Sequence, residues 1–517
     1  MNQAADKLHE YFSRVAHDHP RVMILILVGL VAALSVLVFS HQSLRLDEAQ
    51  SLWQTSHTPS KMLSVIAQDV HVPLYHMILH FWQVAFGNGV ASARTLSLLF
   101  FMLAVPAIYL VGKTTYNNSV GVFAATLLSI SPFMNWYGNE IRMYSLFALI
   151  TILNQYFFIS IFKRESAAGE QRAWAGYAIT AILGLYTHYF FGFALLSQAL
   201  FFVLYRHQFA PYALRRFILC GILVIAAFAP WLGYVWNQGG ASNSRPLIAE
   251  PTSINVFNAF SQFLFGFQND HINTILVSLW PLSVLLVFLS LRAGKKTSPE
   301  SIYLLMALLV PITAVFVIST AIRPIFLTRY LILTLPSLYL VISWLFWTYP
   351  PRLSFLAKGI LVTAITATLV VEIGSANTPV KENYREASAY LSDRARAQDI
   401  IVVSAPFTIY PVEYYYRGPA AIQTLPLWDR YAYGPIPPYV ESQMPAQVDT
   451  IAGTHDTLWL LLSYDQGYEQ KLRYYFDTHY ERIESRTFSP GLTVHGYKLR
   501  YDTKPRPMLS ASSSREQ

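Results

Sequence analysis

Long hydrophobic runs recur along the first three quarters of the chain, and short segments that carry most of the charge separate them. A helix rises about 1.5 Å per residue, so about 20 apolar residues cross a hydrocarbon core of about 30 Å. Eleven runs are interpreted as such spans, near residues 22–39, 95–111, 119–135, 143–162, 174–187, 189–205, 217–235, 274–291, 301–319, 327–347 and 359–375. The pattern predicts an α-helical polytopic membrane protein with about eleven transmembrane helices.

One further apolar run, Leu74–Phe86, has only 13 residues, which suits an interfacial or re-entrant helix better than a span. If it does not cross, 15 basic residues of the membrane part fall on the cytoplasmic side and 7 on the other. If it crossed, that bias would reverse. The positive-inside rule therefore favours a cytoplasmic N-terminus, with the first helix retained, and places residues 377–517 on the non-cytoplasmic side.

Composition agrees with a membrane protein and narrows the classes of partner. The chain is 54% hydrophobic and 13% charged, which excludes a disordered chain or a coiled coil. Residues 1–376 hold 22 Lys+Arg against 13 Asp+Glu, or +9, and the remainder holds 15 against 16, or −1. Because the basic excess belongs to the membrane part, nucleic acid is not expected as a partner. A single Cys220 provides neither a disulfide framework nor a thiolate zinc site.

The C-terminal part has a different pattern. Short β-rich stretches and one helical stretch predict a small α/β domain at residues 377–505. The strands are expected at Asp399–Ser404, Thr457–Ser463 and Leu492–Arg500, and the helix at Arg385–Arg396. The Ser-rich residues 506–517 are expected to be disordered. Residues 1–376 form the predicted membrane domain.

Carboxylates in the first outer loop, residues 40–93, are the first candidate chemistry. Asp47 and Glu48 follow the first span, and Asp69 comes later in the same loop. One of these carboxylates could act as the general base that takes a proton from an acceptor hydroxyl. An adjacent one could orient the nucleophile or hold a divalent cation, with Asp47 and Glu48 as its ligands.

Helix capping is the structural alternative for the same residues. Asp47 followed by Gln50 fits a capping box that opens an interfacial helix at Glu48–Gln54. The sequence leaves both interpretations open.

Basic, aromatic and further polar residues gather at the same predicted membrane boundary. The arginines could bind a lipid phosphate, although ion pairing, snorkelling or anchoring in the aromatic belt would explain them as well. The candidate substrate-binding residues are His71, Tyr75, Arg94, Glu140, Arg142, Tyr144, His188, Arg323, Arg329 and Tyr330. Cations that face loop carboxylates suggest a site where a membrane-embedded phosphate is held while a hydroxyl is activated. No phosphate-binding loop, zinc-protease motif or nucleophile elbow is present.

Several motifs occur in an order that is typical of one superfamily. They are Leu46–Asp47–Glu48–Ala49, Asp69-x-His71-x-Pro73–Leu74–Tyr75, Phe86–Gly87, Ala93–Arg94-x-x-Ser97, Glu140–Ile141–Arg142–Met143–Tyr144, Thr187–His188–Tyr189, Arg329–Tyr330 and Lys381–Glu382–Asn383–Tyr384–Arg385. Together, over roughly residues 20–400, the chain resembles the bacterial C-superfamily glycosyltransferases. It is most similar to the lipid-phosphate-sugar-dependent group of protein O-mannosyltransferases and aminoarabinose transferases. Two departures are Val72 in place of a proline of that group and Ile141 in place of an alanine.

The resemblance implies an integral enzyme of the bacterial inner membrane. It would move a hexosyl or pentosyl group from a polyprenyl-phosphate donor to a hydroxyl of a lipid, glycan or protein, with inversion at the anomeric centre. Carried over by position, Asp47 is the base beside Glu48, and Arg94, Arg142 and Arg329 contact the phosphate. A transporter or flippase for lipid-linked sugars, or a non-catalytic envelope assembly protein, is the alternative. The charges lie at helix ends instead of deep within helices, which favours the enzyme over a transporter.

Overall fold

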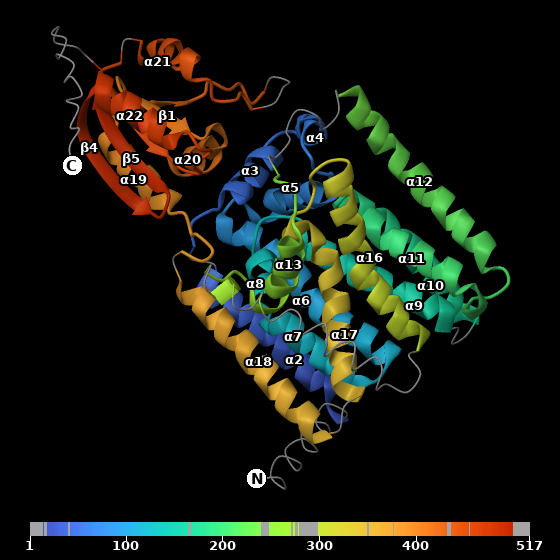
Figure 1. The fold of residues 1–517 in the computed structure, drawn as a ribbon. Coiled ribbons are helices and arrows are strands. Elements are labelled where there is room, and N and C mark those ends of the chain that lie inside the picture. Colours follow the sequence, from blue (N-terminus) through green and yellow to red (C-terminus); the bar gives the residue numbers. More distant parts are fainter. Residues whose placement is uncertain are drawn as a thin grey trace, which may run out of the picture. The chain divides into compact units, whose positions relative to one another are not determined.

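The computed structural model describes residues 14, 18–39, 42–163, 167–238, 248–269, 272–274, 278, 298–348, 351–375, 377–431, 436–453 and 455–499. They fall into two compact units. One is the helical membrane unit and the other a small C-terminal unit built around a sheet (Figure 1).

The helical unit follows the apolar runs of the sequence. Its helices are α2 (Pro20–Leu34, continued by the π-helix Ser35–Phe39), α3 (Leu46–Thr55), α4 (Pro59–Gln68), α5 (Leu74–Phe86), α6 (Val90–Thr115), α7 (Asn118–Ile130), α8 (Pro132–Gly138), α9 (Tyr144–Lys163), α10 (Ala167–Thr187), α11 (Phe191–Leu204), η2 (Arg206–Gln208), α12 (Ala213–Asn237), α13 (Ser253–Phe265), α16 (Pro299–Ala321), η3 (Thr328–Thr334), α17 (Leu335–Thr348) and α18 (Pro351–Gly374). The predicted 13-residue helix Leu74–Phe86 is confirmed as α5.

Seven helical segments of the described residues are long and apolar enough to cross a membrane. They are Pro20–Leu37, Val90–Thr115, Tyr144–Lys163, Ala213–Asn237, Pro299–Ala321, Thr328–Trp347 and Leu356–Gly374. The bent pair α7–α8 could add an eighth. The predicted number of about eleven is therefore not confirmed. Helix α11 is apolar but has only 14 residues, and the predicted run at 274–291 lies almost entirely outside the described residues.

The break between α7 and α8 has a local cause in Ser131–Pro132. The Ser131 hydroxyl accepts the backbone N–H of Met134, and Pro132 occupies the first position of α8. A serine cap and a proline at N1 both favour a new helix start at this point. The axis bends by 64° there, so the chain turns before it reaches the segment that carries Arg142.

Two glycines allow α6 and α7 to pack backbone against backbone. A Cβ atom at Gly112 would lie 2.6 Å from Gly121 Cα, and one at Gly121 would lie 2.5 Å from the carbonyl oxygen of Tyr109. Small residues at helix contacts are the usual means of close approach within membranes. This packing fixes α6, the helix that carries Arg94.

Substitution of Gly121 by alanine is expected to destabilise the membrane unit by about 1–3 kcal/mol, because the new methyl group would meet backbone atoms that cannot rotate away. Thermal unfolding of the purified protein measures this loss. Gly221 of α12 is the matched control, since nothing lies within 4 Å of its Cβ position. Gly221→Ala should be neutral or stabilising, and equal losses in both variants would contradict the packing argument.

The C-terminal unit is a five-stranded sheet with flanking helices. Its elements are α19 (Tyr384–Arg394), β1 (Ile400–Ser404), η4 (Pro406–Thr408), α20 (Ile409–Tyr415), β2 (Ala421–Thr424), η5 (Glu441–Gln443), α21 (Met444–Ala452), β3 (Thr457–Leu462), α22 (Glu469–His479), β4 (Glu481–Ser489) and β5 (Leu492–Lys498). The strand order is β2-β1-β3-β5-β4. β1 runs parallel to β2 and β3, and β5 runs antiparallel to β3 and β4. The short segment Ser43–Leu46 also belongs to this unit.

The three strands and the helix predicted for this unit are confirmed as β1, β3, β5 and α19. The central strands β1 and β3 are almost wholly buried, so they appear in the sequence as apolar runs. The sequence analysis missed β2 and β4, the two edge strands of the sheet. Most residues of β4 are exposed, and without a buried face a strand leaves no hydrophobic alternation to detect. The predicted disordered tail, 506–517, lies outside the described residues.

Candidate active site

Helix α3 places Asp47 and Glu48 in its first turn, where carboxylates interact favourably with the helix dipole. Asp47 lies inside the helix, which begins at Leu46, and is not its cap. The Gln50 side chain donates to Asp69 Oδ2 instead of closing a capping box. The structure therefore rejects the capping-box alternative for this pair.

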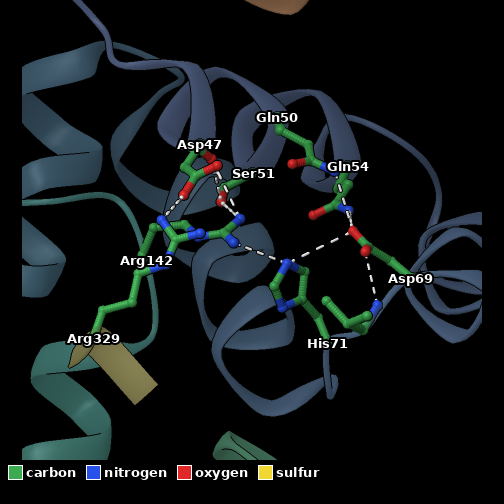
Figure 2. A network of polar contacts seen from close by, with 9 residues as sticks. Asp47, Gln50, Ser51, Gln54, Asp69, His71, Arg142 and Arg329 are labelled. Atoms are coloured by element: carbon green, nitrogen blue, oxygen red, sulfur yellow. Dashed lines mark hydrogen bonds and ion pairs between the residues drawn. The ribbon is translucent and has the colours of Figure 1, made fainter. Parts of the chain in front are cut away.

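Asp47 has separate partners for its side chain and its backbone (Figure 2). Arg329 Nη1 donates to Asp47 Oδ2 at 2.8 Å, and the two side chains remain 32% and 23% exposed respectively. The Asp47 carbonyl oxygen accepts from Ser51 Oγ at 3.0 Å and lies 3.4 Å from Arg142 Nη1. Burial opposes ionisation, but Arg142 and Arg329 outweigh it and lower the pKa of Asp47 to about 2. The carboxylate is thus ionised and accessible.

Glu48, the neighbouring carboxylate, is enclosed. Arg94 donates to it through Nε at 2.9 Å and through Nη2 at 2.6 Å, and the backbone N–H of Ile141 donates at 3.1 Å. The Glu48 side chain is 0% exposed and that of Arg94 is 5% exposed. Arg94 also donates to the carbonyl oxygen of Gln42. This buried bidentate pair ties the start of α3 to α6 and to the segment before α9.

Asp69 is held by neutral donors. The side-chain amides of Gln50 and Gln54 each donate to Oδ2 at 3.1 Å, and the backbone N–H of Val70 donates to Oδ1 at 2.7 Å. Burial raises the pKa of Asp69 above its ordinary value, although these hydrogen bonds oppose the shift. The carboxylate fastens the end of α4 to α3 (Figure 2).

His71 lies between Asp69 and Arg142, with its Nε2 3.6 Å from Asp69 Oδ2. Arg142 Nη2 lies 2.8 Å from His71 Nε2, and because a guanidinium can only donate, Nε2 must be the acceptor. His71 is therefore neutral and carries its proton on Nδ1. Burial, followed by the charge of Arg142, holds the pKa of His71 well below its ordinary value. The neutral imidazole helps to fix the guanidinium beside Asp47.

The depressed histidine pKa predicts a stability loss in acid. In the unfolded chain His71 takes up a proton near pH 6.5, whereas in the folded protein it stays neutral to a lower pH. The free energy of unfolding should therefore fall as the pH drops below 6.5, by up to about 1.4 kcal/mol per pH unit for each such histidine. Burial also lowers the pKa of His76 and of His188, so three groups contribute. Thermal unfolding between pH 7.5 and 5 should show a shallower loss for His71→Gln, whose amide oxygen can still accept from Arg142. An unchanged slope would contradict this assignment.

Comparison with solved structures identifies the fold. The crystal structure of ArnT from Cupriavidus metallidurans in the apo state matches with a TM-score of 0.61 at 12% identity, over 92% of this chain and 97% of that one. The same protein bound to undecaprenyl phosphate matches with a TM-score of 0.59 at 11% identity, with the same coverage. This chain has the C-superfamily glycosyltransferase fold. The resemblance noted in the sequence is confirmed at the level of the fold.

Two further comparisons agree with this assignment. Residues 70–234 match the model of the dolichyl-phosphate-mannose-protein mannosyltransferase family. The cryo-EM structure of the arabinofuranosyltransferase AftD from Mycobacteria matches with a TM-score of 0.53 at 13% identity, over 93% of this chain and 40% of that one. No sequence of a curated protein matches the chain.

Two of the remaining candidates, Tyr330 and His188, lie next to Arg329. Tyr330 stands beside Arg329, with the His188 ring 5.1 Å from it. His188 in turn stacks on Phe147 at 4.9 Å, and Arg329 lies over the Tyr330 ring at 5.7 Å. These rings pack on one another next to Arg329, and of the three only Tyr330 is partly exposed.

The other candidates differ in burial and in their contacts. The Tyr75 hydroxyl is hydrogen-bonded to Ser97 and fully buried. Glu140 is buried and its carbonyl oxygen accepts the backbone N–H of Arg142. Tyr144 is fully buried at the start of α9, with its ring edge-on to Tyr137, and lies close enough to Arg329 for the two side chains to interact electrostatically. Arg323 is exposed.

Three polar residues of α3 were not expected at the site from the sequence, namely Gln50, which was considered only for a capping box, Ser51 and Gln54. Together with Asp47 they recur every three or four residues, which places them on one face of a helix. That periodicity is a signal that could have identified them.

A divalent cation does not fit the pair of carboxylates first considered for it. Asp47 is paired with Arg329, and Glu48 is enclosed by Arg94 and the N–H of Ile141. Within the described part of the chain, no three His, Cys, Asp or Glu side chains converge as metal ligands would.

Proposed function

We propose that this protein is an integral-membrane glycosyltransferase that moves a hexosyl or pentosyl group from a polyprenyl-phosphate donor to a hydroxyl of a lipid, glycan or protein. The observation that carries the proposal is the accessible Asp47–Arg329 pair, in which an ionised carboxylate stands 2.8 Å from a cation at the start of a membrane-spanning segment. The C-superfamily fold and the lipid phosphate bound to ArnT support the class of donor.

The two side chains divide the chemistry between them. Asp47 accepts the proton of the acceptor hydroxyl while the oxygen of that hydroxyl forms a bond with the anomeric carbon of the donor sugar. The bond between that carbon and the donor phosphate breaks, and its electron pair leaves with the polyprenyl phosphate. Arg329 stabilises the charge that develops on the phosphate. Attack opposite the leaving group inverts the anomeric centre.

We assign different roles to Arg94, Arg142 and Arg329, which the sequence did not distinguish. Arg94 and Arg142 are buried and held by protein groups, so Arg329 is the main phosphate contact and the other two position the loop. Glu48 and Asp69 are likewise positioning residues, because their carboxylate oxygens are engaged by buried donors. Tyr330, which is partly exposed beside Arg329, is the aromatic side chain against which the donor would lie, with the buried His188 ring packed behind it.

The membrane setting follows from the charge bias of the sequence. We place the protein in the bacterial inner membrane, among its lipids, with the N-terminus in the cytoplasm and the C-terminal unit in the periplasm or outside the cell. Transfer then takes place on the outer face.

A transfer assay tests the proposal. Purified protein in lipid nanodiscs is incubated with a panel of polyprenyl-monophosphate sugars and hydroxyl acceptors from envelope extracts, and released polyprenyl phosphate is measured. Nucleotide sugars serve as negative controls. Turnover with one lipid donor supports the enzyme. Movement of intact donor across the bilayer in proteoliposomes, without cleavage of any donor, would replace it with a flippase.

A further inference from the structure

Two ion pairs that begin at adjacent residues of α3 differ in accessibility. The Glu48–Arg94 pair is bidentate and its side chains are 0% and 5% exposed. The Asp47–Arg329 pair is joined by one hydrogen bond of 2.8 Å, with side chains 23% and 32% exposed. Successive residues of a helix point about 100° apart, which sends one carboxylate inward and the other toward solvent.

This difference determines which pair an incoming anion can open. Breaking a buried ion pair leaves an uncompensated buried charge and is strongly unfavourable. A pair that keeps contact with solvent is weaker, because water can replace part of the interaction. A phosphate that reaches the site can therefore compete for Arg329, whereas it cannot compete for Arg94.

Asp47 stays in place when its side chain loses that partner. Its carbonyl oxygen accepts from Ser51 Oγ at 3.0 Å, and the Arg142 guanidinium lies 3.4 Å from the same oxygen. Arg142 is in turn fixed by His71 at 2.8 Å. The Ser51 bond lies within α3, and Glu48 ties the helix to Arg94 and to the N–H of Ile141. None of these contacts uses the Asp47 carboxylate, so α3 keeps its anchors when Arg329 leaves.

We propose that donor binding exchanges the partner of Arg329: the donor phosphate takes the guanidinium from Asp47, and the freed carboxylate then accepts the proton of the acceptor. This inference rests on the proposed function. It gives the base two states. Without donor its charge is balanced by both Arg142 and Arg329, and with donor only the charge of Arg142 remains beside it. Activation of the acceptor thus becomes conditional on a bound donor.

The test is a double-mutant cycle on the binding of undecaprenyl phosphate, measured in nanodiscs for the wild type, Asp47→Asn, Arg329→Gln and the double variant. Exchange predicts that Asp47→Asn binds the lipid about two- to fivefold more tightly than the wild type, because the competing carboxylate is gone. In the Arg329→Gln background the same change should have no effect. A cycle isolates this pairwise dependence.

Simple charge repulsion between Asp47 and the phosphate makes a different prediction. It would improve binding equally in both backgrounds, and that result would overturn the exchange, as would the absence of any gain in Asp47→Asn. Arg329→Met, which keeps an unbranched side chain but removes the charge, repeats the cycle if Arg329→Gln does not fold. Arg394→Gln, which removes an exposed pair with Glu484 in the C-terminal unit, should bind like the wild type.

The transfer assay separates the two ideas. Lipid binding that follows the cycle, with no transfer from any donor, would retain the exchange and reject the glycosyltransferase. Transfer with equal gains in both backgrounds would retain the enzyme and reject the exchange.

Discussion

Asp47→Asn should lower kcat by about 10²- to 10⁴-fold, the usual contribution of a positioned general base. Asparagine has nearly the same shape and can still accept the hydrogen bond from Arg329, but it cannot take a proton from the acceptor. The fold should survive, because the Asp47–Arg329 pair is partly exposed and α3 is anchored through Glu48. Transfer by the purified variant in nanodiscs, beside its thermal unfolding curve, measures both expectations.

Asp69→Asn is the matched control for this substitution. Its carboxylate is held by the amides of Gln50 and Gln54, so the variant should lose less activity than Asp47→Asn. Wild-type kcat in Asp47→Asn would show that the base is another residue, with Glu48 and Asp69 next to test.

Arg94→Ala should cost about 3–5 kcal/mol of stability, because it leaves the Glu48 carboxylate buried and without its bidentate partner. Arg94→Ala should also lower kcat, since the Glu48–Arg94 pair fixes the turn of α3 that carries Asp47. Thermal unfolding in detergent measures the first effect, and kcat of the protein that remains folded measures the second.

Removal of both Glu48 and Arg94 shows whether the stability loss in Arg94→Ala comes from the unpaired buried charge or from lost packing. The double variant Glu48→Leu with Arg94→Leu leaves no unpaired charge and should be more stable than Arg94→Ala. If the double variant were less stable than the single one, the hydrogen bond from the Ile141 N–H and the shape of the site would matter more than the ion pair.

Local features of the sequence predicted much of the fold. The 13-residue run became α5 with the same bounds, and the buried strands β1 and β3 lie where apolar runs placed them. The edge strands β2 and β4 were missed because they have little buried surface. The number of spans was not confirmed, since α11 has only 14 residues and the run at 274–291 lies almost entirely outside the described residues.

The candidate site was predicted less completely. The sequence placed Asp47 and Glu48 side by side and treated Arg94, Arg142 and Arg329 as equivalent. It could not pair them, because Arg94 lies 46 residues from Glu48 and Arg329 lies 282 residues from Asp47.

By itself, the sequence determined that this is a helical membrane protein with acidic and basic residues at one predicted membrane boundary, and it indicated the superfamily. Hydrophobic periodicity and charge bias are properties of short segments, so they can be read without knowledge of the fold. Only the tertiary structure decided that Glu48 is enclosed by Arg94 while Asp47 stays accessible beside Arg329. That choice depends on which distant segments pack against each side of α3, and this packing decides which carboxylate stays accessible.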